Sequence, residues 1–134
     1  MASNYTLNAN SINSNSGCCV QGLISGIQNV VADGSNISDA TVLTLASGNI
    51  FAVTGANITK GVLLPQLSTV PLGQHVYILN KAQGINSLQV YPYLPIDTIW
   101  PNSASVRVTL GGESILHAIK IDNDTWFVGK LSGD

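Results

Sequence analysis

From Ala40 onward, short runs of Val, Ile, Leu and Thr are each closed by Gly, Asn, Asp or Pro. Strands favour β-branched residues and are bounded by such turn residues, so this pattern is typical of an all-β sandwich or barrel. No internal repeat is strong enough to predict a solenoid. We therefore expect an antiparallel β-sandwich, jelly-roll-like in type, over residues 40–134. Its strands are predicted at residues 41–46, 50–54, 61–64, 75–79, 87–91, 97–100, 105–110, 114–121 and 125–131.

Two turns and one strand refine this prediction. Gly111 and Gly112 stand between two apolar runs at the spacing of a two-residue hairpin, where glycine supplies positive φ without steric strain. Residues 122–124 (Asp-Asn-Asp) predict a second hairpin by the same reasoning. Residues 114–121 alternate with period two but are mostly apolar on both faces. Such a strand fits a sheet that is covered on both sides, by a second sheet and by a neighbouring subunit.

Residues 1–39 differ from the rest of the chain and predict an N-terminal arm. The first charged residue is Asp33, and Asn, Ser and Gly are frequent before it. Gly22 and Gly26 oppose a regular helix, and their G-x-x-x-G spacing predicts close backbone packing in an oligomer. Apolar side chains in an arm must be buried against the β-domain, a neighbouring subunit or another surface. The arm residues expected to make such contact are Val20, Leu23, Ile24, Ile27, Val30 and Val31.

The chain is poor in charge. Charged residues make up 9% of it, against about 25% in an average soluble domain, while hydrophobic residues make up 45%. A net charge of −2 with five Lys and Arg gives no electrostatic basis for nucleic-acid binding. No apolar run is long enough to predict a membrane span. Low charge with high apolar content predicts an obligate oligomer; a monomer solvated by Asn, Ser, Thr and Gln is the alternative.

Residues suited to catalysis or metal binding are scarce, so we expect neither an enzyme nor a cofactor. The single glutamate follows a predicted turn, and the aspartates lie where turns are expected. His75 and His117 fall in separate strands without a cysteine or carboxylate at ligand spacing, and Cys18 and Cys19 are adjacent. No metal site is therefore predicted. The first residues lack the basic and apolar regions of a secretory signal.

Several segments resemble β-modules of tailed-bacteriophage virions. The resemblance rests on GVLLP (61–65), LGQHVYILN (72–80), LQVYP (88–92), DTI (97–99) and DTWFV (124–128). Such modules occur in capsid decoration (cement) proteins and in head or tail fibres, commonly as homotrimers. The resemblance implies a non-enzymatic virion protein, made in the bacterial cytoplasm, whose trimers bind the major capsid protein on the outer capsid surface. The arm residues would then contact the capsid.

The aromatic residues indicate an alternative function. A phage fibre tip or a lectin-like module binds glycans through aromatic faces, and Tyr91, Tyr93 and Trp100 are the candidates for such a platform. Trp126 and the neighbouring Phe127 are instead expected in the core, because aromatic side chains in a terminal strand are usually buried.

Overall fold

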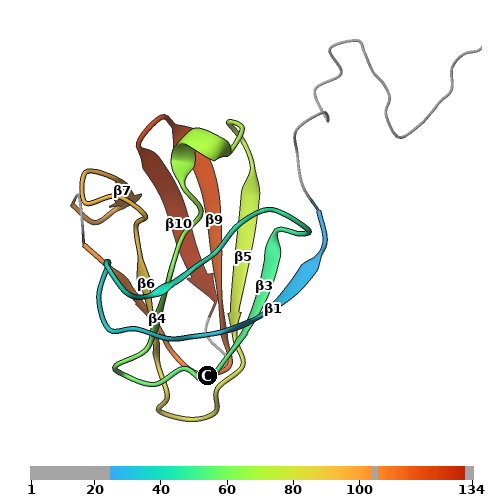
Figure 1. Cartoon of the computed structure of the whole chain (residues 1–134), viewed down its shortest axis with the longest axis vertical. Coiled ribbons are helices and arrows are strands. Elements are labelled where there is room, and N and C mark those ends of the chain that lie inside the picture. The colour runs from blue at the N-terminus through green and yellow to red at the C-terminus, as the bar shows by residue number, and fades with distance from the viewer. Residues whose placement is uncertain (1–24, 104–105, 132–134) are drawn as a thin grey trace, which may run out of the picture.

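The computed structural model describes residues 25–103 and 106–131, which form an all-β structure with one short 3₁₀ turn (Figure 1). Its elements are β1 (Ile27–Val31), β2 (Thr41–Val42), β3 (Ile50–Thr54), β4 (Gly61–Leu63), η2 (Leu67–Thr69), β5 (His75–Asn80), β6 (Leu88–Tyr91), β7 (Thr98–Trp100), β8 (Val108–Leu110), β9 (Ser114–Asp122) and β10 (Thr125–Leu131).

The strands form two sheets, and the chain alternates between them. Sheet A has the order β1-β3-β5-β9-β10-β7, and sheet B has the order β2-β4-β6-β8. Strands β1, β3 and β5 stack in parallel in sheet A, as β2, β4 and β6 do in sheet B. The chain therefore winds as a parallel-rich β-solenoid of about four turns. The predicted antiparallel, jelly-roll-like β-sandwich is wrong, although the chain is all-β.

The coils of the solenoid differ in length, so the sequence shows no repeat of fixed period. Ile50 lies beside Ile27 in the sheet, and Tyr77 lies beside Ile50, so the second of these coils is longer than the first. A fixed period is what reveals a repeat in a sequence, and none is present. The parallel stacking ends at β9, which runs antiparallel to both β5 and β10.

The predicted turns have different outcomes. The hairpin at residues 122–124 is confirmed, because β9 and β10 pair across it and the Asp124 N–H donates to Asp122 Oδ1 at 3.2 Å. The hairpin at Gly111 and Gly112 is wrong: β8 pairs with β6 in sheet B, whereas β9 pairs with β5 in sheet A. This turn carries the chain from one sheet to the other, and the positive φ falls on Glu113.

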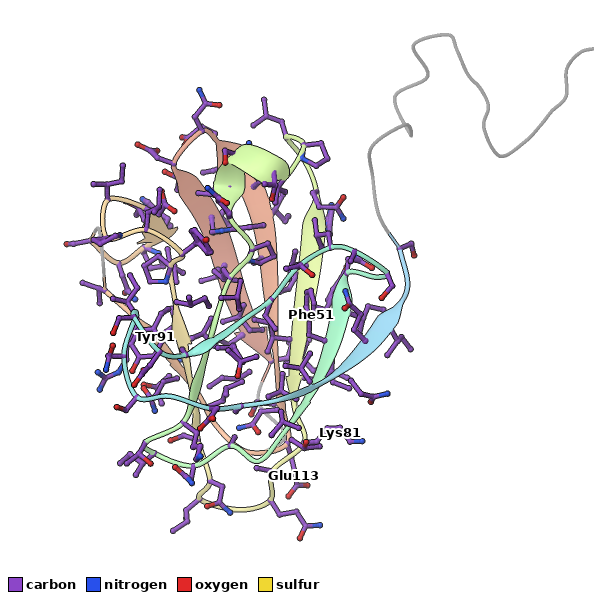
Figure 2. All side chains as sticks on the ribbon, in the orientation of Figure 1. Phe51, Lys81, Tyr91 and Glu113 are labelled. Atoms are coloured by element: carbon purple, nitrogen blue, oxygen red, sulfur yellow. The ribbon has the colours of Figure 1, made fainter. Side chains whose placement is uncertain are left out.

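The hydrophobic core fills the space between the two sheets. Trp126, Phe51, Ile78 and Leu116 are among its largest buried side chains, and Phe51 lies near the middle of the molecule (Figure 2). Val30 in β1 packs against this core. Residues 27–31 of the expected arm thus form the first strand of sheet A, while residues 1–24 lie outside the described residues.

The outer face of sheet B is covered by the chain itself. Residues 33–40 cross it, and the Tyr91 hydroxyl donates to the Ser35 carbonyl at 2.7 Å (Figure 1). Ala40, Leu63 and Tyr91 form a small buried cluster there, joined by Ile37 and Tyr93. The middle strands of sheet B, β4 and β6, are therefore buried on both faces within one subunit.

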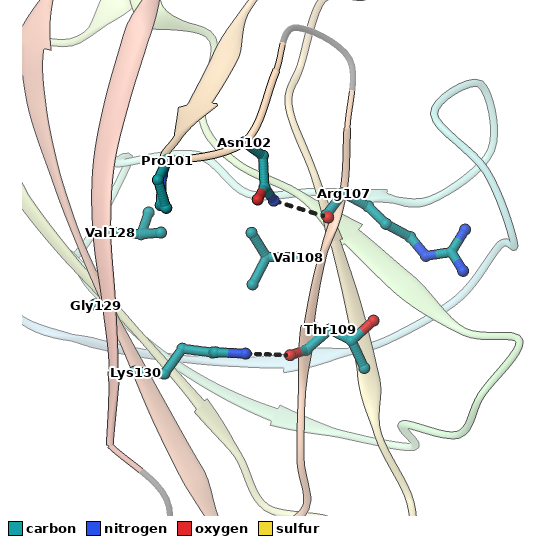
Figure 3. A pocket seen from close by; sticks show the side chains of 8 residues that line it. All are labelled: Pro101, Asn102, Arg107, Val108, Thr109, Val128, Gly129 and Lys130. Atoms are coloured by element: carbon teal, nitrogen blue, oxygen red, sulfur yellow. Dashed lines mark hydrogen bonds between the residues drawn. The ribbon is translucent and has the colours of Figure 1, made fainter.

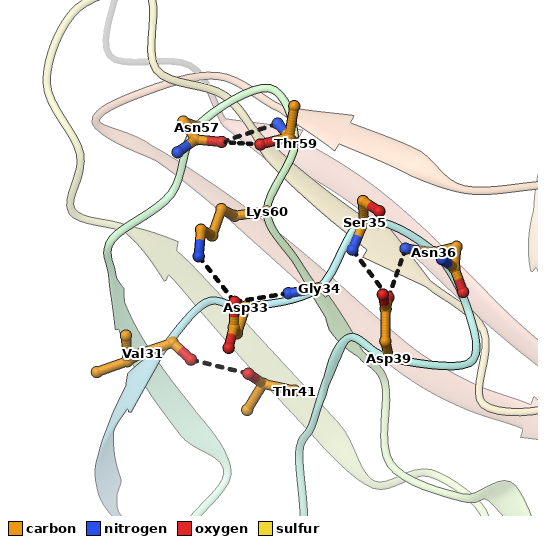
Figure 4. Close-up of polar contacts among 10 residues, drawn as sticks. All are labelled: Val31, Asp33, Gly34, Ser35, Asn36, Asp39, Thr41, Asn57, Thr59 and Lys60. Carbon is orange, nitrogen blue, oxygen red and sulfur yellow. Dashed lines mark hydrogen bonds and ion pairs between the residues drawn. The ribbon is translucent and has the colours of Figure 1, made fainter.

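Polar contacts hold this covering segment in place (Figure 4). The Asp39 carboxylate accepts hydrogen bonds from the Ser35 and Asn36 N–H groups at 2.8 and 2.9 Å. The Lys60 ammonium pairs with Asp33 at 2.7 Å, and this contact lowers the pKa of Asp33. These bonds fix the loop at both of its ends, next to β2 and β4.

A buried lysine fixes η2 to sheet A. Lys120 is 7% exposed, and its ammonium donates to the Leu67 and Val70 carbonyls at 2.9 and 2.8 Å. We expect Lys120→Met to reduce the free energy of unfolding by about 1–3 kcal/mol, because methionine fills the space but leaves these carbonyls without that donor. Urea unfolding followed by circular dichroism measures the change. A variant as stable as the parent would show that these two bonds add no net stability.

Candidate functional site

The outer face of sheet A is the main exposed feature of the described structure. Strand pleating sends alternate side chains outward, away from the core. We call these outward positions the sheet A face: Ile27, Asn29, Val31, Ile50, Ala52, Thr54, His75, Tyr77, Leu79, Trp100, Ile115, His117, Ile119, Ile121, Phe127, Gly129 and Leu131. None of these positions carries Asp, Glu, Lys or Arg.

Large apolar side chains on this face are open to solvent. Ile27, Val31 and Leu131 are 68%, 66% and 69% exposed, and Trp100, Ile121 and Phe127 are about half exposed. Together they present on the order of several hundred Å² of apolar surface, more than scattered exposed side chains would give. Exposed apolar side chains that gather on one face are typical of a site of interaction.

Strand register arranges the face in cross-strand rows. In one row Trp100 lies beside Phe127, Phe127 beside Ile119, and Ile119 beside His75. The Trp100 and Phe127 rings are stacked, with centroids 5.1 Å apart and planes 11° from parallel. In the next row Tyr77 lies between Ile50 and His117. The rows make one continuous surface across the sheet.

Two histidines meet at the centre of the sheet A face. His75 Nδ1 and His117 Nε2 are 2.7 Å apart, within hydrogen-bond distance, although the two residues are far apart in the sequence. The Tyr77 ring stacks on His117 with centroids 4.5 Å apart and planes 7° from parallel. Burial lowers the pKa of His117, and the neighbouring His75 lowers it further. Sequence reasoning treated the two histidines as separate; their outward positions could have suggested a pair once β5 and β9 were known to be neighbours.

The donor set at this pair does not make a full metal site. Zinc sites in proteins use three or four protein ligands, and two imidazoles supply two. Within residues 25–103 and 106–131, no three His, Cys, Asp or Glu side chains gather in a way that could hold a metal ion.

The residues predicted as a glycan platform do not come together. Trp100 lies on the sheet A face, half exposed beside Phe127. Tyr91 is buried on the other side of the molecule under residues 33–40, and Tyr93 is half-buried against the same cluster. Figure 2 shows Tyr91 on the sheet B side. The three aromatic rings therefore form no common binding surface.

The predicted arm residues are divided among three places. Ile27 and Val31 lie on the sheet A face, and Val30 points into the core. Val20, Leu23 and Ile24 lie outside the described residues. Contact with another surface by the whole set of six is thus excluded in the folded subunit, because Val30 is held between the sheets.

A small cleft of about 270 Å³ lies where β8 faces β10 and the end of β7 (Figure 3). The Lys130 ammonium donates to the Thr109 carbonyl at 3.1 Å, and the Asn102 amide donates to the Arg107 carbonyl at 3.2 Å. The Arg107 guanidinium points away from the cleft. The lining includes no carboxylate, histidine or cysteine, and the ammonium of its lysine is bound to the Thr109 carbonyl.

Comparison with protein-family models, with curated proteins and with solved structures finds no match to this chain. In the described part of the chain, no helix has the length and apolar character needed to cross a membrane.

Proposed function

We propose that this chain is a non-enzymatic structural protein of a bacteriophage virion, which assembles as homotrimers and binds the major capsid protein on the outer surface of the capsid. Its role there is to stabilise the shell. The segment resemblance supports the choice of particle and the number of subunits. The sheet A face supports the assembly, and it is the observation on which the proposal depends.

The face fits a second copy of this chain better than a charged partner. Complementary interfaces match charge with opposite charge, and this face carries none. A chain with 9% charged residues offers the same uncharged, apolar chemistry on its other copies. A standard interface buries about 800 Å² per partner, and the exposed side chains of the face supply a large part of that area.

We place the capsid contact in the residues that precede β1, with Val20, Leu23 and Ile24 as the apolar contacts. Their neighbours Ile27, Val30 and Val31 are held in sheet A and are no longer available to an arm. Three such segments on one trimer raise the effective concentration of each contact, so weak contacts can add to retention by factors of ~100 or more.

Light scattering coupled to chromatography and co-sedimentation with capsids test this function. We expect the full chain at micromolar concentration to elute at three times the 14.0 kDa subunit mass, and to bind saturably to capsids that lack it. A monodisperse species of one subunit mass would contradict the assembly. A trimer that does not bind capsids but binds glycans would favour the fibre-tip or lectin-like alternative.

A further inference from the structure

The histidine pair on the sheet A face shares one proton between its facing nitrogens. A hydrogen bond across the 2.7 Å from His75 Nδ1 to His117 Nε2 needs one N–H and one lone pair. A neutral pair or a singly protonated pair can make this bond. When both imidazoles are protonated, two N–H groups face each other, and two positive charges stand on rings whose centroids are 4.9 Å apart.

Among residues 25–103 and 106–131, no anionic side chain faces the pair to balance these charges. On β5 the neighbouring outward side chain is Tyr77, whose ring stacks on His117. Across β9 and β10, Ile119 lies beside His75 and Gly129 beside His117. Among the charged residues of these strands, Lys120 of β9 is buried and donates to the Leu67 and Val70 carbonyls, Lys130 of β10 donates to the Thr109 carbonyl, and Asp122 ends β9. Lys81, Glu113 and Asp124 lie just outside the strands. Asp122 lies three residues beyond Ile119, about 10 Å along the strand from the pair.

We infer that protonation of His75 and His117 controls self-association through the sheet A face, so that subunits assemble at neutral pH and separate in mild acid. This inference rests on the proposed assembly through that face. A second copy that covers the face removes water from the pair, and burial disfavours imidazolium. In the free subunit, water can still solvate both charges.

The direction of the pH dependence follows from proton linkage. Burial in the assembly lowers the histidine pKa values below those of the free subunit, so the assembly binds fewer protons. Association is therefore strongest at a pH above the pKa values of the pair in the free subunit and weakens as the pH falls through them; burial and the neighbouring His75 already lower the pKa of His117 in that subunit. If trimer formation releases one proton from each of the three histidine pairs, the trimer association constant falls by up to ~1000-fold for each unit by which the pH is lowered.

The test compares the full chain with the double variant His75→Gln/His117→Gln at pH 7.5, 6.5 and 5.5 and constant ionic strength. Glutamine keeps hydrogen-bonding capacity but does not titrate. The chain has two histidines, so this variant removes every imidazole while leaving all carboxylates in place. Sedimentation velocity at micromolar concentration gives the oligomeric state, and circular dichroism shows that each protein stays folded.

We expect the parent to be trimeric at pH 7.5 and mostly monomeric at pH 5.5, and the double variant to be trimeric at both. A parent that stays trimeric at pH 5.5 overturns the inference and leaves the proposed assembly intact. A parent that is monomeric at pH 7.5 contradicts the assembly itself. Dissociation of the folded variant in acid assigns the effect to carboxylates and also overturns the inference.

The single variant His75→Gln tests the inference if the double variant does not fold. His75 is exposed, so His75→Gln changes no core contact and still removes the shared proton. We expect its trimer to survive to a pH at least one unit lower than the parent trimer. An unchanged dissociation midpoint in this variant overturns the inference.

Discussion

Replacing Trp126 with alanine is expected to reduce the free energy of unfolding by about 3–5 kcal/mol. Trp126 is 1% exposed and is among the largest buried side chains between the sheets. Its removal loses the transfer free energy of the indole and leaves a cavity that two hydrogen-bonded sheets cannot close. Chemical denaturation followed by circular dichroism measures the change. A domain of this size is stable by about 5–15 kcal/mol, so the variant is expected to be close to unfolding at 37 °C.

Trp126→Phe is the matched control for this loss. Phenylalanine keeps an aromatic ring in the core and leaves a smaller cavity. We therefore expect Trp126→Phe to lose less than half of the unfolding free energy that Trp126→Ala loses. An alanine variant that loses less than about 1 kcal/mol would show that Trp126 is not enclosed between the two sheets. Equal losses in both variants would point to a specific contact of the indole instead of its volume.

The location of the strands could be predicted because it is encoded locally. The predicted strands at residues 50–54 and 125–131 match β3 and β10 in both bounds. The alternation in residues 114–121 also predicted how the side chains of β9 divide between its two faces, but because both faces are mostly apolar it did not indicate which one lies toward the core. Trp126 is buried as expected, while the neighbouring Phe127 is exposed, because successive residues of a strand point to opposite faces.

The pairing of those strands could not be predicted because it depends on distant residues. The glycines at 111 and 112 indicated a turn, but a turn does not specify whether the next strand joins the same sheet. Parallel stacking of β1, β3 and β5 brings together segments whose spacing along the chain varies. For the same reason the His75–His117 contact, which forms between neighbouring strands of the sheet, was missed.

The glycine spacing had a different physical basis from the one expected. Gly26 packs within the chain against the turn before β3, where a Cβ at Gly48 would lie 2.4 Å from the Gly26 carbonyl. Close backbone approach was predicted correctly from the residue type, but its partner is the second coil of the same solenoid. The described part of this motif therefore gives no support to contact between subunits. Gly22 lies outside the described residues.

Replacing Ile119 with lysine is expected to convert the trimer into monomers. Ile119 faces outward at the centre of the sheet A face, between Phe127 and His75. In a free subunit the lysine stem lies along the sheet and its ammonium reaches water. In the assembly the same charge would be buried without an anion, because no carboxylate occupies the face. A loss of several kcal/mol of association energy corresponds to more than a 100-fold weaker assembly, which sedimentation velocity at pH 7.5 measures.

The matched control for this charge is Ile85→Lys. Ile85 is 98% exposed in the loop between β5 and β6, away from the sheet A face, so the substitution adds the same charge in place of the same side chain. We expect this variant to remain trimeric, because its lysine stays in water whether or not subunits assemble. If both variants dissociate, net charge governs association. If Ile119→Lys folds and stays trimeric, the subunits meet elsewhere, and the loop surface around Ile85 becomes the next interface to test with a larger substitution.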